Sequence, residues 1–209
     1  MKLSLLLMML LVTIASTSAQ TKPQLVQHQL VDVQKIHPRI VIDIRYATTN
    51  NFMKKAVYPS ARCLLQKPVA ERLARVQARL EKDGLGLKIF DAYRPLSAQW
   101  ELWNIVPNPT FVADPRKGSK HNRGAAVDVT LVDSLGNELE MPTQYDEFVR
   151  AARSTYDKLP KHILANRATL HNAMKAEGFI PNPSEWWHFD DKDWKKFPIL
   201  DVAFDAVPE

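Results

Sequence analysis

The segment SKHNRGAAVDVTL, residues 119–131, combines an imidazole and a carboxylate around a glycine turn. His121 precedes the glycine, and Asp128 lies inside the apolar run that follows it. Strand alternation is one explanation, because it would direct Asp128 and Thr130 to water while their neighbours face the core. A metal site is the other, since neutral imidazole and aspartate are both zinc ligands and a strand holds a ligand rigidly.

A catalytic zinc site needs three protein ligands and an open position for water, so a third ligand is expected elsewhere. His188 is the candidate, because it lies among aromatic residues in SEWWHFD and Glu185 stands three residues before it. Packing is the alternative role for His188, but an unpaired buried carboxylate at Glu185 would be costly. The other histidines lie in the N-terminal segment or among polar residues of a helical region, where solvated or hydrogen-bonded histidines are expected: His28, His37, His162 and His171.

These segments resemble the motifs of a known enzyme family. SKHNRGAAVDVTL resembles the S-x-H-x-x-G-x-A-x-D signature of zinc D,D-peptidases, and EWWHF resembles their E-x-W-H signature. DIRYATTNNF (43–52), DAYRP (91–95) and MPTQYDEF (141–148) resemble the VanX-type D-alanyl-D-alanine dipeptidases. The resemblance implies an α+β fold of the type shared with D,D-carboxypeptidases and the Hedgehog signalling domain, in which helices flank a small antiparallel sheet.

The resemblance also implies roles for the metal-site residues. His121, Asp128 and His188 match the ligands of one zinc ion, which lowers the pKa of bound water to about 7 and polarises the scissile carbonyl. Glu185 matches the catalytic glutamate, which takes a proton from the water and gives it to the leaving amine.

Four further residues match family positions around the substrate. Arg94 matches the arginine that stabilises the oxyanion, a task suited to a permanently charged fork of donors. A structural ion pair with Asp91 is the alternative role for Arg94. Ser119 and Tyr46 match substrate-contact positions that can donate hydrogen bonds, and Asp146 matches one suited to the substrate ammonium; a surface polar residue is the alternative for each.

The expected activity is zinc-dependent hydrolysis of the free dipeptide D-alanyl-D-alanine to two D-alanines. Another zinc peptidase of the same fold is the nearest alternative, either a periplasmic D,D-carboxypeptidase or a peptidoglycan endopeptidase acting on stem peptides. A zinc-bearing wall-binding module is the non-enzymatic alternative, but Glu185 and Arg94 are not needed merely to hold a metal. The S-x-x-K signature of serine-type wall enzymes and the H-E-x-x-H zinc motif do not occur in the sequence.

The N-terminus has the pattern of a secretory signal peptide. Met1-Lys2 precedes the apolar run LSLLLMMLLVTIA, and small residues follow up to Ala19. An uncleaved anchor is disfavoured, because the run from Leu3 to Ala15 is shorter than the roughly 20 residues of a spanning helix. We expect cleavage near Ala19, a single catalytic domain over residues 20–209, and a periplasmic or secreted protein. The glycopeptide-resistance dipeptidases that the chain resembles are cytoplasmic, so export would be a departure from them.

Composition agrees with a globular protein that does not bind nucleic acid. Hydrophobic residues make up 45% of the 209 residues, which is enough for a sizeable core. The net charge is +5, but the Lys and Arg residues are scattered and lack interleaved aromatic platforms. Cys63 is the only cysteine, so no internal disulfide forms; its apolar neighbours favour a buried, inert thiol over a nucleophile.

The elements that must position these residues follow from hydrophobic periodicity and turn signals. A stripe of Val69, Leu73, Val76 and Leu80 after Pro68 predicts a helix that ends at Asp83-Gly84. Ser97 is expected to cap a helix that carries Trp100 and Trp103. The remaining expectations are an extended lead-in over residues 20–38, strands in 40–45, 86–95 and 126–131, a helix over 161–177 and a last strand near 188.

Overall fold

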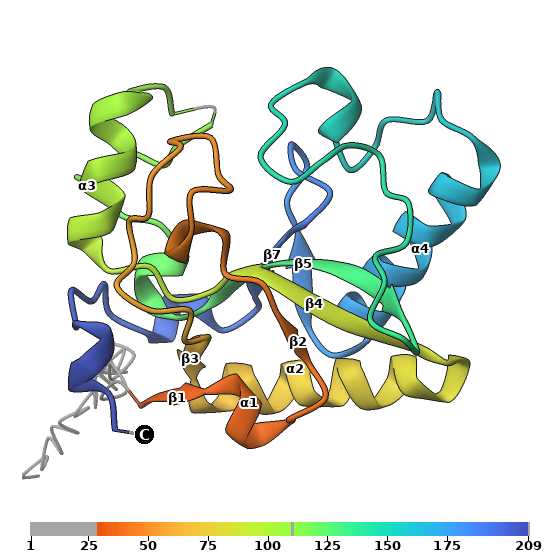
Figure 1. Cartoon of the computed structure of the whole chain (residues 1–209), viewed down its shortest axis with the longest axis horizontal. Helices are drawn as coiled ribbons and strands as arrows, with labels where there is room; N and C mark the ends of the chain where they lie inside the picture. The colour runs from red at the N-terminus through yellow and green to blue at the C-terminus, as the bar shows by residue number, and fades with distance from the viewer. Residues whose placement is uncertain (1–28, 110, 209) are drawn as a thin grey trace, which may run out of the picture.

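The computed structural model describes residues 29–109 and 111–208 (Figure 1). The expected signal peptide, its cleavage site near Ala19 and His28 lie outside the described residues. The main sheet has five strands in the order β2 (Val41–Ile42), β4 (Leu85–Asp91), β5 (Ala126–Asp133), β7 (His188–Asp191) and β6 (Phe179–Pro181). A second, two-stranded sheet pairs β1 (Leu30–Asp32) with β3 (Leu64–Gln66).

The expected α+β class is confirmed. Strand pairs β4–β5, β5–β7 and β6–β7 are antiparallel, as is β1–β3. The exception is β2, which pairs with β4 in parallel, so the main sheet is not wholly antiparallel. The helices are α1 (Val33–Ile36), α2 (Lys67–Leu80), α3 (Leu96–Ile105) and α4 (Lys161–Ala176). In Figure 1, α2 runs along the lower side of the sheet, α4 lies toward its right end, and α3 stands apart at the upper left.

Helix α2 forms for the reasons that its sequence indicates. Pro68 occupies the first turn, where its missing N–H has no intrahelical partner to lose. The predicted apolar stripe is fully buried against the sheet side of the molecule. The chain leaves through the short 3-10 helix Glu81–Asp83 and turns at Gly84, whose φ of +69° is the left-handed conformation that glycine tolerates best.

Three local expectations differ from the structure. Ser97 is not a helix cap, because α3 begins one residue earlier with Pro95 at the N-cap, and the Ser97 hydroxyl instead donates to Asp201 at 2.7 Å. The strand expected over 40–45 is limited to β2, because the chain curls into the 3-10 helix Arg45–Ala47. The lead-in is not uniformly extended, since β1 and α1 both fall within it.

The core fills the space between the sheet and the helices. Val127, Val129 and Leu131 of β5 are fully buried, as are the paired tryptophans Trp186 and Trp187. Cys63 is 1% exposed, and burial raises the pKa of its thiol, which agrees with an inert core residue. None of the helices in the described part of the chain has the length and apolar content needed to cross a membrane.

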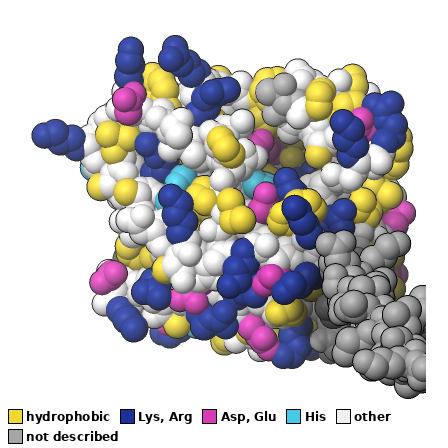
Figure 2. Space-filling model, turned by 180° about the vertical axis from the view of Figure 1, so that it is seen from behind, with side chains coloured by type: hydrophobic (Ala, Val, Ile, Leu, Met, Phe, Trp, Pro, Cys, Tyr) yellow, Lys and Arg dark blue, Asp and Glu magenta, His cyan; other side chains and the backbone are white. Residues whose placement is uncertain are grey.

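Charged side chains of both signs share one face of the molecule. Figure 2 shows Lys and Arg side chains spread over one side of the molecule, with Asp and Glu side chains among them. Several Arg side chains of the described residues are paired with carboxylates, for example Arg75 and Arg79 with Glu177.

Candidate active site

The register of the central strands brings two of the predicted metal ligands together. In the antiparallel pairing of β5 and β7, Asp128 lies directly opposite His188. Directly opposed residues project onto the same face of a sheet, so both side chains point to one spot. Asp128 is 4% exposed and Thr130 is 1% exposed, so strand alternation does not turn them toward water.

The turn before β5 supplies the third side chain. His121 begins the 3-10 helix His121–Arg123, and Gly124 follows with a φ of +61°. A Cβ at Gly124 would lie 2.7 Å from the Leu30 side chain and 3.2 Å from the Gln66 backbone nitrogen, so only glycine fits this close approach without a shift. The turn thereby returns the chain into β5 with His121 facing Asp128.

Hydrogen bonds fix which atom of each ligand faces the centre. His121 Nδ1 lies 2.7 Å from the Ala92 carbonyl oxygen, which can only accept, so Nδ1 carries the proton and Nε2 has the free lone pair. His188 Nε2 lies 2.9 Å from an oxygen of the Asp190 carboxylate, so its Nδ1 faces inward. Asp128 Oδ1 is then 2.9 Å from His188 Nδ1 and 3.4 Å from His121 Nε2.

This donor set fits a zinc ion. The three inward atoms lie within 4.8 Å of one another, and all three residues are buried. Two imidazole nitrogens and one carboxylate oxygen are a typical set of ligands for catalytic zinc, and each histidine has a hydrogen-bonded outer partner, as zinc-binding histidines usually do.

The electrostatics also favour a cation at this point. Burial raises the pKa of Asp128, but His121 and His188 outweigh that effect and hold its pKa well below the usual range. Burial lowers the pKa of His188, but hydrogen bonds to Asp128 and Asp190 outweigh it and raise the pKa to about 10. The centre therefore combines an ionised Asp128 carboxylate with a His188 imidazole that its carboxylate neighbours make more basic.

Glu185 lies beside the three candidate ligands. Its Oε2 is 3.9 Å from His188 Nδ1 and accepts a hydrogen bond from Asn182 Nδ2 at 3.0 Å. Burial raises the pKa of Glu185, and Asp128 adds to that rise. A carboxylate with a raised pKa is suited to taking a proton and giving it back near neutral pH.

Arg94 is both paired and directed at the cavity. Its Nη2 donates to Asp91 Oδ2 at 2.6 Å, so the ion pair considered from the sequence exists. Its Nη1 donates to Gln99 Oε1 at 2.8 Å, and Tyr58 contacts Nε at 3.3 Å. Each terminal nitrogen carries two hydrogens, so N–H groups remain for a ligand in the cavity that Arg94 lines.

The substrate-contact candidates line the same cavity as Arg94. The Tyr46 hydroxyl donates to Asp146 Oδ2 at 2.8 Å, and Asp146 adopts a φ of +59°. Burial and the nearby Asp128 raise the pKa of Asp146 well above its usual value. The Ser119 side chain accepts a hydrogen bond from the backbone of His121 at 3.2 Å.

All the site residues named from the sequence line one cavity of about 240 Å³. They are Tyr46, Arg94, Ser119, His121, Asp128, Asp146, Glu185 and His188. They come from five separate segments of the chain, and the fold alone brings them together.

Comparison with known proteins shows what kind of chain this is. Residues 26–205 match the peptidase M15 family, described as D-Ala-D-Ala dipeptidase. The chain belongs to this family. It is therefore a hydrolytic peptidase, and the resemblance seen in the sequence motifs is confirmed.

Curated relatives cover most of this M15 peptidase. A D-alanyl-D-alanine dipeptidase of Escherichia coli is 40% identical over 84% of this chain and 91% of its own length. One of Streptomyces coelicolor is 32% identical over 78% of this chain and 90% of its own length. A solved structure of a vancomycin-resistance D,D-pentapeptidase VanY variant in complex with Zn(II) has 17% identity and a TM-score of 0.40, over 64% of this chain and 75% of that one.

Four residues of this M15 peptidase contact the site and were not found from the sequence. Tyr145 donates to Asp128, Asp190 accepts from His188, Asn182 donates to Glu185, and Gln99 accepts from Arg94. Tyr145 directly precedes Asp146, and Asp190 lies two residues after His188. This closeness to predicted site residues could have identified both from the sequence. Asn182 and Gln99 carry no signal of this kind, because their roles depend on tertiary contacts.

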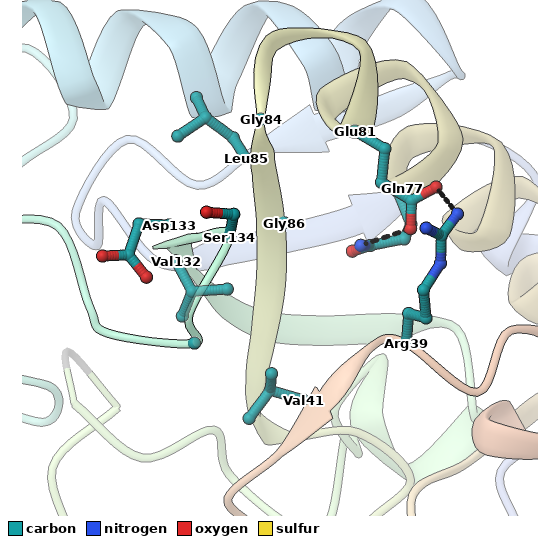
Figure 3. A pocket seen from close by; sticks show the side chains of 11 residues that line it. Arg39, Val41, Gln77, Glu81, Gly84, Leu85, Gly86, Val132, Asp133 and Ser134 are labelled. Atoms are coloured by element: carbon teal, nitrogen blue, oxygen red, sulfur yellow. Dashed lines mark hydrogen bonds and ion pairs between the residues drawn. The ribbon is translucent and has the colours of Figure 1, made fainter.

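A second cavity lies away from this site. It has a volume of about 220 Å³ and lies at the start of β4, where α2 ends (Figure 3). Glu81 accepts hydrogen bonds there from both Arg39 and Gln77. Its main charged groups thus neutralise each other, and it is not part of the candidate active site.

Proposed function

We propose that this M15 peptidase hydrolyses free D-alanyl-D-alanine to two D-alanines with one zinc ion held by His121, Asp128 and His188. Family membership and the names of the relatives support the substrate, and the inward-facing donor set supports the metal. Zinc, when bound, supplies a Lewis acid that polarises a carbonyl and favours deprotonation of water.

The chain's own residues provide the remaining chemistry. Glu185 takes a proton from the attacking water and later gives it to the departing amine, which its raised pKa and its place beside the ligands favour. Arg94 donates to the carbonyl oxygen as that oxygen gains negative charge. Asp91 and Gln99 hold the guanidinium in place, so little reorganisation is needed during the reaction.

The observation that carries the preference for a free dipeptide is Asp146. This carboxylate lies in the same cavity as Glu185, where Tyr46 donates a hydrogen bond to it while burial and the nearby Asp128 raise its pKa. The ammonium of a free dipeptide would supply the missing positive charge. An N-acetylated or N-extended peptide lacks that charge and adds bulk, so it would bind poorly. Ser119 and Tyr46 are proposed as the hydrogen-bonding groups for the rest of the substrate.

A comparison of substrates tests this function. Zinc-loaded protein is incubated with D-Ala-D-Ala, L-Ala-L-Ala and N-acetyl-D-Ala-D-Ala, and the release of alanine is measured. Hydrolysis of the free D,D-dipeptide alone is expected. Equal kcat/KM on the free and acetylated substrates would instead favour the alternative of a D,D-carboxypeptidase or peptidoglycan endopeptidase acting on stem peptides.

We also propose that residues 1–19 are a cleaved signal peptide and that residues 20–209 form one catalytic domain in the periplasm or outside the cell. The charged start, apolar run and small residues of the N-terminal sequence support this location. N-terminal sequencing of the protein from a periplasmic fraction should begin near Gln20. A product that begins at Met1 and stays with the membrane would contradict it.

A further inference from the structure

The two oxygens of Asp128 have different partners. Oδ1 faces His188 Nδ1 and His121 Nε2, whereas Oδ2 accepts a hydrogen bond from the Tyr145 hydroxyl at 3.0 Å. One oxygen is thus directed to the metal centre, and the other is held by a side chain from a different part of the chain. Neither the family match nor the sequence motifs give Tyr145 a role.

Packing fixes the position of the Tyr145 hydroxyl. The ring lies 4.8 Å from Phe90 and 5.6 Å from Trp187 between ring centroids, with Tyr46 at 6.5 Å. A carboxylate oxygen can only accept, so the Tyr145 hydroxyl is the donor in its contact with Asp128 Oδ2. An aromatic side chain with two torsions and three ring neighbours has little freedom, which makes it a precise support.

The next residue links this support to the substrate wall. Asp146 follows Tyr145 and turns the backbone with a φ of +59°, so that the two side chains reach different groups. Tyr145 contacts the proposed ligand Asp128, whereas Asp146 contacts Tyr46. A single loop between β5 and α4 therefore reaches both the metal ligands and the substrate-contact residues.

We propose that Tyr145 is a positioning residue that makes Asp128 a ligand through one oxygen only. A carboxylate can bind a metal through one oxygen or both, and a hydrogen bond that holds one oxygen toward its donor orients the group so that the other faces the metal. One-oxygen binding leaves room for a water molecule and the substrate carbonyl beside three protein ligands. The inference rests on the proposed zinc site.

The variant Tyr145→Phe tests this role, because it keeps the ring and removes only the hydroxyl. Loss of an outer hydrogen bond to a metal ligand typically weakens metal affinity by roughly 10- to 100-fold, and this range is expected in a chelator competition with zinc. The cobalt-substituted variant should also show altered d–d absorption, because the second Asp128 oxygen becomes free to approach the metal.

Tyr93→Phe is the matched control. Its hydroxyl is hydrogen-bonded too, but to the backbone of Val202: it donates to the carbonyl oxygen at 3.0 Å and accepts from the N–H at 2.7 Å. Zinc affinity of this variant should match wild type even if its stability falls. Tyr145→Leu provides a second hydroxyl-free variant, for which the same loss of zinc affinity is expected.

Melting temperatures separate a positioning role from a structural one. A positioning role predicts that zinc raises the melting temperature of Tyr145→Phe less than that of wild type, relative to each protein in chelator. An unchanged zinc-induced increase, with wild-type zinc affinity, would overturn the inference and leave the proposed function intact. Failure of the wild-type protein itself to bind zinc would overturn the proposed function instead.

Discussion

Glu185→Gln separates the chemistry of the site from its metal binding. Glutamine has nearly the same shape and can still accept from Asn182, which donates to Glu185 at 3.0 Å, but it cannot take a proton. General acid–base catalysis contributes about 10²- to 10⁴-fold. At about 1.36 kcal/mol for each factor of ten, removing it should raise the barrier by about 2.7–5.4 kcal/mol. We expect kcat to fall at least about a hundredfold while zinc content stays at the wild-type level.

The same substitution should stabilise the metal-free fold. Burial raises the pKa of Glu185 in the folded protein above its value in the unfolded chain. At any pH between these two values, the native state therefore binds more protons than the unfolded state. Stability therefore falls as pH rises through that interval, and the full penalty is present above the folded pKa. Glutamine carries no such penalty. Urea unfolding in chelator should show Glu185→Gln more stable than wild type at neutral pH, with the difference vanishing below about pH 4.

Glu177→Gln is the matched control, and its effect on stability at neutral pH should have the opposite sign. Arg79 and Arg75 lower the pKa of Glu177, so this carboxylate stabilises the fold above its unfolded pKa and loses that effect as pH falls. Glu177→Gln should therefore lower stability slightly at neutral pH and leave kcat unchanged. Near-wild-type turnover of zinc-loaded Glu185→Gln would refute the assignment of the base. A stability difference that does not depend on pH would refute the burial argument.

Three further predictions concern the other site residues. His121→Ala should lose the metal, so elemental analysis should find about one zinc per wild-type chain and a clear deficit in the variant; full retention would remove His121 from the ligand set. Arg94→Ala should keep its zinc, and its activity should fall about 10²- to 10³-fold, chiefly in kcat. The reason is that the contact of Arg94 with the carbonyl oxygen strengthens as the oxyanion forms; a change in KM alone would contradict this. Asp146→Asn should lower kcat/KM on D-Ala-D-Ala. The ratio of kcat/KM on the free dipeptide to kcat/KM on N-acetyl-D-Ala-D-Ala should therefore be smaller than in wild type. Since the pKa of Asp146 is raised, wild-type kcat/KM should also fall on acidification at a higher pH than an ordinary aspartate would give. In Asp146→Asn only the part of this fall that comes from protonation of Glu185 should remain.

Much of the site was predictable because its residues lie in short, ordered segments. The imidazole and carboxylate of residues 121–128 share one turn and strand, and Glu185 and His188 share one short segment. Local spacing is enough to suggest ligands in such cases, and the motif resemblance then added Arg94, Ser119, Tyr46 and Asp146. The α2 stripe was equally local, since 3.6-residue periodicity depends only on the order of residues.

Tertiary structure decided how these segments meet. The pairing of Asp128 with His188 depends on the register of β5 and β7, and a shift by one residue would turn Asp128 to the other face. The contact of Tyr145 with Asp128 requires the loop after β5 to fold back over the sheet. Local sequence also failed to predict the role of Ser97 at the start of α3, because its partner Asp201 lies about a hundred residues away in the chain. Local sequence determines which groups are available, whereas packing between distant segments determines which atom of each group faces the site.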